Sequence, residues 1–142
     1  MSVKRAVEYN FKVRLDEEFE NSNIKVVEST RLEERILPCI IVNGGDSTLA
    51  VDHPESMTNY EVKLDLLILT NIDEMTVNEH KDILDKCLRK MNEKETRKLS
   101  RIQYLYLYET FFENTIEEYS ERKMATSITY KVICNYNPYG FQ

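Results

Sequence analysis

The amino-acid sequence predicts an α+β domain with a mostly antiparallel sheet of four to five strands, two helices packed on one face and a long hairpin arm. Three observations lead to this fold class. One segment has a helix cap and helical periodicity, several segments alternate apolar and polar residues, and one polar stretch contains two glycines. The 142 residues suffice for one domain with a hydrophobic core, so we expect residues 1–142 to form a single unit.

The first segment, residues 3–19, fits two patterns. Apolar residues recur at every fourth position through it, as on one face of a helix. Residues 7–15 also alternate apolar and polar, as in a strand, whereas the acidic residues at 16–18 favour the helix. After this ambiguous segment, the short apolar runs at 24–27 and 36–42 predict strands.

The middle of the chain carries the clearest patterns. Residues 60–70 alternate apolar and charged side chains, which predicts a strand. Thr76 and Glu79 have the spacing of a capping box, and the apolar residues after them keep helical spacing, so we expect a helix over 77–92. The charged residues 93–101 predict a last helical turn and a loop. Two further alternating segments predict strands at 103–112 and 126–136.

A stretch of small polar residues, Asn43-Gly44-Gly45-Asp46-Ser47, follows the second apolar run. A phosphate-binding loop would continue into a helix, because the amides at the helix N-terminus bind the anion. Here the chain continues without helical periodicity and without a lysine after the glycines. Since Asn-Gly and Gly-Asp pairs favour turns, the sequence predicts a hairpin turn at this place, within a long loop or arm over 43–59.

An alternative function is that of a Mg²⁺-dependent nuclease of the PD-(D/E)xK class. Asp52 precedes Glu61-Val62-Lys63, and these are the residue types with which such nucleases bind the metal and position a water molecule. Glu61 and Lys63 lie, however, on the charged side of an alternating strand, and Asp52 falls within the arm. A solvated strand face explains the pattern more simply, so we expect a protein that is not an enzyme.

The composition argues against several other classes of function. A net charge of −6 opposes a general DNA-coating role. The three cysteines are far apart, and neither they nor His53 and His80 form a cluster with metal-ligand spacing, so we expect no cofactor. The opening residues are too polar for a signal peptide, and no apolar run reaches the ~18 residues of a membrane span. We therefore expect a reduced, cytoplasmic setting, without a membrane.

Opposite charges gather in two consecutive segments. Seven basic residues lie within 86–101, and five glutamates lie within 109–121. One interpretation is a set of ion pairs within the molecule. The other is a head-to-tail contact between copies, in which a basic edge meets an acidic edge and the chain of copies closes into a ring. The aromatic C-terminal tail at 135–142 is expected to dock on the body or on a partner.

With its elements placed, the chain resembles the tail terminator, or head-to-tail joining, proteins of long-tailed bacteriophages. The resemblance extends from about residue 24 to residue 136, after an early helix. The residues that carry it are Leu37-Pro38-Cys39-Ile40-Ile41-Val42, Val62-Lys63-Leu64-Asp65-Leu66-Leu67-Ile68, the turn Asn71-Ile72-Asp73, His80 in the following helix, and Glu121-Arg122-Lys123 ahead of Ile128-Thr129-Tyr130-Lys131-Val132.

The resemblance implies a structural virion protein rather than an enzyme. It would form a homo-oligomeric ring, of about six copies, that terminates the tail tube and docks it to the head connector. DNA would pass through the ring without specific binding, and the family's hairpin arm would correspond to residues 43–59. Other neck or tail-completion subunits are the alternative. The candidate interface residues are Asp46, Ser47, Asp52, His53, Arg89, Lys90, Arg97, Glu117, Glu118, Tyr139 and Phe141.

Overall fold

A computed structural model describes residues 1–30, 36–49 and 59–138 of the chain. The elements follow one another in the order α1 (Val3–Phe19), β1 (Lys25–Glu28), β2 (Cys39–Leu49), β3 (Asn59–Asn71), α2 (Val77–Asn92), α3 (Lys94–Lys98), β4 (Leu105–Tyr119) and β5 (Lys123–Tyr136). Four of the candidate interface residues, Asp52, His53, Tyr139 and Phe141, lie outside the described residues.

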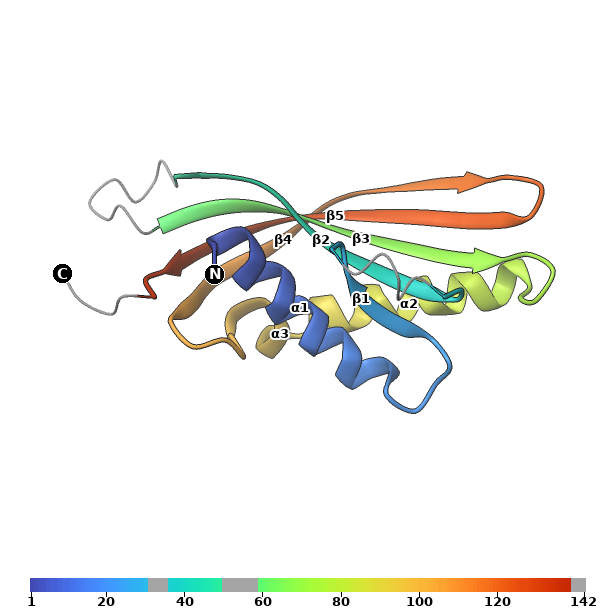
Figure 1. The fold of residues 1–142 in the computed structure, drawn as a ribbon, viewed down its shortest axis with the longest axis horizontal. Helices are drawn as coiled ribbons and strands as arrows, with labels where there is room; N and C mark the ends of the chain where they lie inside the picture. Colours follow the sequence, from blue (N-terminus) through green and yellow to red (C-terminus); the bar gives the residue numbers. More distant parts are fainter. Residues whose placement is uncertain (31–35, 50–58, 139–142) are drawn as a thin grey trace.

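The strands form one five-stranded sheet in the order β1-β2-β3-β5-β4. Only β1 and β2 pair in parallel among the described strands, and the other three pairings are antiparallel. The three helices lie together on one side of this sheet (Figure 1). The predicted α+β class, with helices on one face of a mostly antiparallel sheet, is therefore confirmed. The short helix α3 replaces part of the loop predicted over 93–101, because the chain turns at Glu93, whose backbone is extended, and then forms a second short helix.

Helix α1 resolves the ambiguity at the start of the chain in favour of the helix. The Ser2 side chain accepts a hydrogen bond from the Arg5 amide and caps its first turn. Phe11 and Leu15 on its apolar face are fully buried in the core against the sheet. The strand alternative for 7–15 is wrong because residues at every fourth position, rather than every second, face the core.

Helix α2 begins with the predicted capping box. The Thr76 hydroxyl accepts from the Glu79 amide at 3.1 Å, and the Glu79 carboxylate accepts from the Thr76 amide at 3.2 Å. Its apolar face, which includes Ile83, Cys87 and Met91, is buried in the core. The cap and the apolar spacing therefore specify the same helix.

Replacing Thr76 with Ala is expected to lower the free energy of unfolding by about 1 kcal/mol, because the Glu79 amide loses its acceptor. Urea unfolding followed by circular dichroism measures this change. Thr76→Ser keeps the hydroxyl and serves as the control, which we expect to lie within about 0.5 kcal/mol of the wild type. Equal losses in the two variants would contradict the capping role.

The turn predicted at the two glycines is wrong. Gly44 pairs with Leu64 and Ser47 with Val62, so β2 continues through this stretch with one extra residue, as a β-bulge. A Cβ atom on Gly44 would lie 2.5 Å from the Lys4 carbonyl oxygen, so only glycine allows α1 to approach so closely. Consequently 43–49 belongs to β2 instead of the predicted arm, and the connection between β2 and β3 falls outside the described residues.

The sheet has a covered face and an open face. Val62, Leu64, Leu66 and Ile68 of β3 are fully buried under the helices, as the alternating pattern predicts. Strand β4 is longer than the predicted 103–112 and reaches Tyr119. Strand β4 forms one edge of the sheet, and every residue of its second half is exposed, whereas Leu105, Leu107 and Thr110 of its first half are buried.

Candidate functional site

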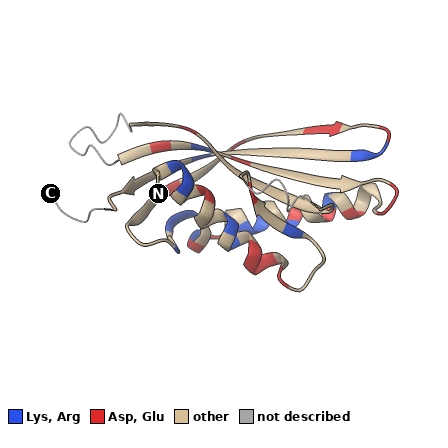
Figure 2. Ribbon diagram, viewed as in Figure 1, with Lys and Arg blue, Asp and Glu red and all other residues tan. Residues whose placement is uncertain are grey.

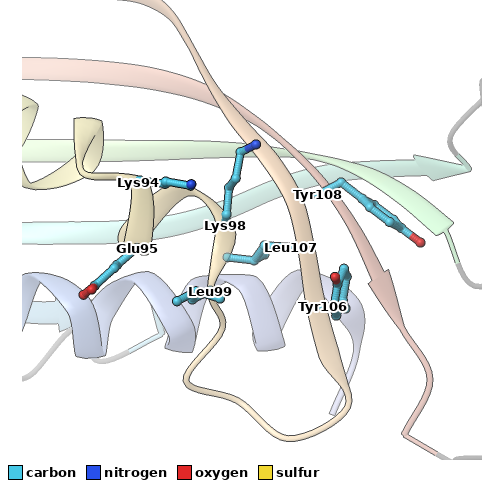
Figure 3. A pocket seen from close by; sticks show the side chains of 7 residues that line it. All are labelled: Lys94, Glu95, Lys98, Leu99, Tyr106, Leu107 and Tyr108. Carbon is cyan, nitrogen blue, oxygen red and sulfur yellow. The ribbon is translucent and has the colours of Figure 1, made fainter.

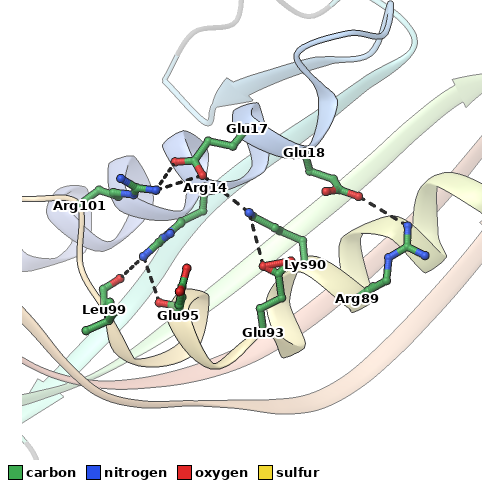
Figure 4. Close-up of polar contacts among 9 residues, drawn as sticks. All are labelled: Arg14, Glu17, Glu18, Arg89, Lys90, Glu93, Glu95, Leu99 and Arg101. Atoms are coloured by element: carbon green, nitrogen blue, oxygen red, sulfur yellow. Dashed lines mark hydrogen bonds and ion pairs between the residues drawn. The ribbon is translucent and has the colours of Figure 1, made fainter.

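The candidate residues of the basic segment form ion pairs within the molecule. Arg89 lies 3.6 Å from the Glu18 carboxylate, and Lys90 lies 3.7 Å from Glu17 and 3.6 Å from Glu93 (Figure 4). Because Glu17 and Glu18 belong to α1, these contacts join α1 to α2. Arg89 and Lys90 therefore form ion pairs within the molecule, as the first interpretation of the charge pattern expects. Such partly exposed pairs contribute only about 0–1 kcal/mol each to stability.

A buried arginine that the sequence analysis did not single out positions α3. The Arg14 guanidinium donates to the Glu95 carbonyl oxygen at 3.1 Å and to the Leu99 carbonyl oxygen at 2.8 Å (Figure 4). The Glu95 carbonyl oxygen also accepts from the Leu99 amide at 2.9 Å, whereas the Leu99 carbonyl oxygen lies just beyond the C-terminal end of α3. Arg14 thus fixes α3 and its basic residues on the body. In the sequence, the signal for this role is that Arg14 falls beside the apolar stripe of the first helix, where a buried arginine needs hydrogen-bond partners.

Helix α3 and β4 enclose a pocket of about 490 Å³. Lys94, Glu95, Lys98 and Leu99 line it from the α3 side; of the β4 residues that line it, Leu107 points toward α3, whereas Tyr106 and Tyr108 lie on the far side of the strand (Figure 3). Leu99 is 57% exposed and Tyr106 is 64% exposed, so the pocket offers apolar surface to the solvent. This site, which we call the α3–β4 pocket, combines an apolar lining with two lysines.

Cations outnumber anions around the α3–β4 pocket. Glu109 lies 3.6 Å from Arg97 and 3.7 Å from Lys98, so one carboxylate is shared by two basic side chains. Lys94 has no ion pair within 4 Å among the described residues, and Glu95 is the remaining acid at the rim. The candidate residue Arg97 lies beside this pocket, because it shares Glu109 with Lys98, but its side chain lines a neighbouring pocket with Phe112.

The candidate residues Glu117 and Glu118 lie on the second half of β4, Phe111–Tyr119, which we call the outer β4 segment. Every residue of this segment is exposed. The segment contains three glutamates, Glu113, Glu117 and Glu118, among four large apolar or aromatic side chains, and Figure 2 shows the acidic colour near the end of β4. The segment has no basic residue, although Arg122 and Lys123 follow in the turn. It is thus the acidic counterpart of the α3–β4 pocket.

The outer β4 segment is apolar on both faces of the sheet. On the helix side, the Phe112 ring contacts Tyr130 edge-on at 5.8 Å and is 55% exposed. On the open side, Phe111 lies under the Lys131 ammonium at 5.5 Å, and Ile116 is 54% exposed opposite Ser127. Large apolar side chains gathered in this way on an edge strand are typical of interaction surfaces.

Asp46 and Ser47, the remaining candidate residues in the described part of the chain, lie at the end of β2. Both are exposed; Asp46 belongs to the bulge, and Ser47 is the first residue paired with β3 after it. Upstream of them, the buried Glu8 carboxylate accepts from the Gly44 amide at 2.9 Å, and from the amide and hydroxyl of Ser29 at 3.2 and 3.1 Å. Glu8 therefore links α1, the end of β1 and the bulge of β2.

His80 is buried beneath the base of the β4–β5 hairpin. Its Nδ1 atom lies 2.7 Å from the Thr70 hydroxyl of β3, and its Nε2 atom lies 2.8 Å from the Thr126 hydroxyl of β5. Burial lowers the pKa of His80, while the nearby Glu117 carboxylate opposes this shift. The Tyr119 ring approaches the imidazole edge-on, with centroids 6.3 Å apart. His80 is therefore a core residue whose two ring nitrogens both have hydrogen-bond partners.

The described residues do not assemble the nuclease site. Glu61 and Lys63 lie on β3, where the Glu61 carboxylate is 3.9 Å from Lys131, and Asp52 is outside the described residues. In the described part of the chain, no group of three or more histidine, cysteine or acidic side chains could hold a metal ion. The three cysteines are buried free thiols, and burial raises the pKa of Cys134 to about 12. Cys87 and Cys134 belong to the hydrophobic core.

No helix within 1–30, 36–49 or 59–138 has the length and apolar character needed to cross a membrane.

Comparison with known proteins identifies a likeness in fold. No protein-family model matches the sequence, and no curated protein matches it. Among solved structures, a chain in the virion of the native gene transfer agent (GTA) particle is similar, with a TM-score of 0.61 and 11% sequence identity. The similarity covers 94% of this chain and 95% of that chain, so essentially the whole fold is shared. The protein therefore has the fold of a chain found in a phage-like virion.

Proposed function

We propose that the protein is a structural subunit of a phage-like virion, which forms a ring at the head–tail junction, terminates the tail tube and docks it to the head connector. The observation that carries this proposal is the similarity of the whole fold to a chain of the gene transfer agent virion. The resemblance of the sequence to tail terminator proteins selects the head–tail junction among virion positions. Another neck or tail-completion position is the alternative.

The surfaces of the subunit suit repeated contacts between copies. An acidic, apolar strand segment and a basic, apolar pocket are both exposed on one small domain. When two different surfaces of one subunit bind each other, the copies assemble head to tail and close into a ring if the rotation permits. An overall charge of −6 would let DNA pass through such a ring without specific binding.

The purified protein is expected to form a closed ring of about six copies. Native mass spectrometry measures the copy number, and negative-stain electron microscopy shows whether the particles are rings. A tagged protein added to tail tubes from the particle that encodes it should then bind only the end that joins the head. Gold label along the tube, or on the capsid shell, would contradict the proposed position even if rings form.

A further inference from the structure

We propose that the outer β4 segment of one copy docks into the α3–β4 pocket of the next copy. This inference rests on the proposed ring and names the two surfaces that would hold it together. Both surfaces expose apolar side chains, and they carry opposite charges. The contact is therefore heterologous: each copy uses its acidic strand segment on one neighbour and its basic pocket on the other.

The outer β4 segment has the features of a surface that another chain covers. All nine residues from Phe111 to Tyr119 are exposed, and they include Phe112, Ile116 and Tyr119. Within the described residues, β4 has a strand neighbour only on its β5 side. An exposed edge strand with apolar side chains on both faces promotes pairing and burial against another chain.

Two copies of β4 would pair poorly with each other. An antiparallel pairing would bring Glu113, Glu117 and Glu118 of one copy close to the same acids of the other, and facing like charges are destabilising in sheets. Register shifts between Leu107 and Glu109, and between Phe112 and Asn114, also interrupt the regular edge. The complementary occupant is a basic surface with apolar side chains.

The α3–β4 pocket meets this requirement on the same chain. Its lining exposes Leu99 and Tyr106, and Lys94 and Lys98 stand at its rim (Figure 3). The single acid that faces Lys98, Glu109, is already shared with Arg97. An incoming strand with glutamates at its surface would supply the missing negative charge and bury its apolar side chains on Leu99 and Tyr106.

The two surfaces cannot meet within one molecule. Tyr106 in the pocket and Tyr119 at the end of the outer segment lie on the same strand, 13 residues apart in sequence. At ~3.3 Å per residue, they are separated by about 40 Å. Only a second copy can bring the outer segment to the pocket, and repetition of this contact builds the head-to-tail assembly.

A charge-swap experiment tests the contact. One variant carries Glu117→Lys with Glu118→Lys, and the other carries Lys94→Glu with Lys98→Glu. Each variant alone should associate at least about tenfold more weakly than the wild type, because like charges then face each other at the contact. An equimolar mixture should regain assembly, because the altered, basic strand segment of one variant faces the altered, acidic pocket of the other, and the two unaltered surfaces match as in the wild type. Sedimentation velocity measures both effects.

The control replaces two exposed lysines of α2 outside the pocket, Lys81→Glu with Lys86→Glu, and should assemble like the wild type. Circular dichroism melting of each variant establishes that it is folded. The proposed contact would be overturned if either variant alone still formed rings. It would also be overturned if the mixture stayed dissociated while the wild type formed rings. Neither result would contradict the proposed ring itself. A wild type that is monomeric at every concentration would overturn both the contact and the proposed ring.

Discussion

Replacing Glu8 with Ala is expected to lower the free energy of unfolding by about 3 kcal/mol. The Glu8 carboxylate is 2% exposed and accepts hydrogen bonds from the amides of Gly44 and Ser29 and from the Ser29 hydroxyl. The Ser29 amide also donates to the Val42 carbonyl oxygen, so it would keep one acceptor in the variant. The buried Gly44 amide would lose the Glu8 acceptor. A buried donor without a partner costs about 1–3 kcal/mol, and the removed side chain adds a cavity.

Urea unfolding of Glu8→Ala at constant pH measures this loss. The matched control is Glu20→Ala, which removes an exposed carboxylate next to the same helix and should change the stability by less than about 0.5 kcal/mol. Glu8→Gln retains one acceptor oxygen and should fall between the two. A Glu8→Ala protein as stable as Glu20→Ala would show that the bulge does not depend on this carboxylate.

Replacing His80 with Leu is expected to lower the free energy of unfolding by about 2 kcal/mol. The imidazole joins the buried hydroxyls of Thr70 and Thr126, and leucine would leave both without this partner. Replacing all three polar groups together, as His80→Leu with Thr70→Val and Thr126→Val, removes the unpaired hydroxyls. The triple variant should therefore be more stable than His80→Leu alone, which urea unfolding tests directly. A further loss in the triple variant would contradict the network.

The same histidine makes the stability depend on pH. Burial holds the pKa of folded His80 below 6.5, so below about pH 6.5 the unfolded chain binds a proton that the folded protein does not. The stability from neutral His80 is thus complete above pH 6.5 and declines as the pH falls toward the lowered pKa, by at most about 1.4 kcal/mol per pH unit. Subtracting the pH profile of His80→Leu isolates this contribution from Glu117 and the other carboxylates. Identical pH profiles of the wild type and His80→Leu below pH 6.5 would contradict this contribution of His80.

The two clusters stabilise different parts of the sheet. Glu8 holds the bulge of β2 through the Gly44 amide. His80 joins β3, β5 and α2 close to Glu117 and Tyr119 of the outer β4 segment. Loss of the His80 cluster is therefore expected to disturb a proposed contact surface as well as the stability.

Elements with strong local signals were predictable from the sequence. The capping box of Thr76 and Glu79 and the apolar spacing after it specify α2, and strict alternation specifies the buried side of β3. Such signals depend on residues within one or two turns, or on neighbouring positions of one strand, so they are readable without knowledge of the fold. The acidic and basic segments were also visible as charge patterns.

Tertiary structure decided the features that depend on residues far apart in the chain. The two glycines form a bulge rather than a turn because α1 packs closely on Gly44 and Glu8 binds its amide. Arg89 and Lys90 pair with α1 because the fold brings the two helices together. The sequence by itself thus determined the fold class, the capped helix and the charge segregation. Tertiary packing decided which charges are neutralised and which surfaces stay exposed, since both depend on long-range contacts.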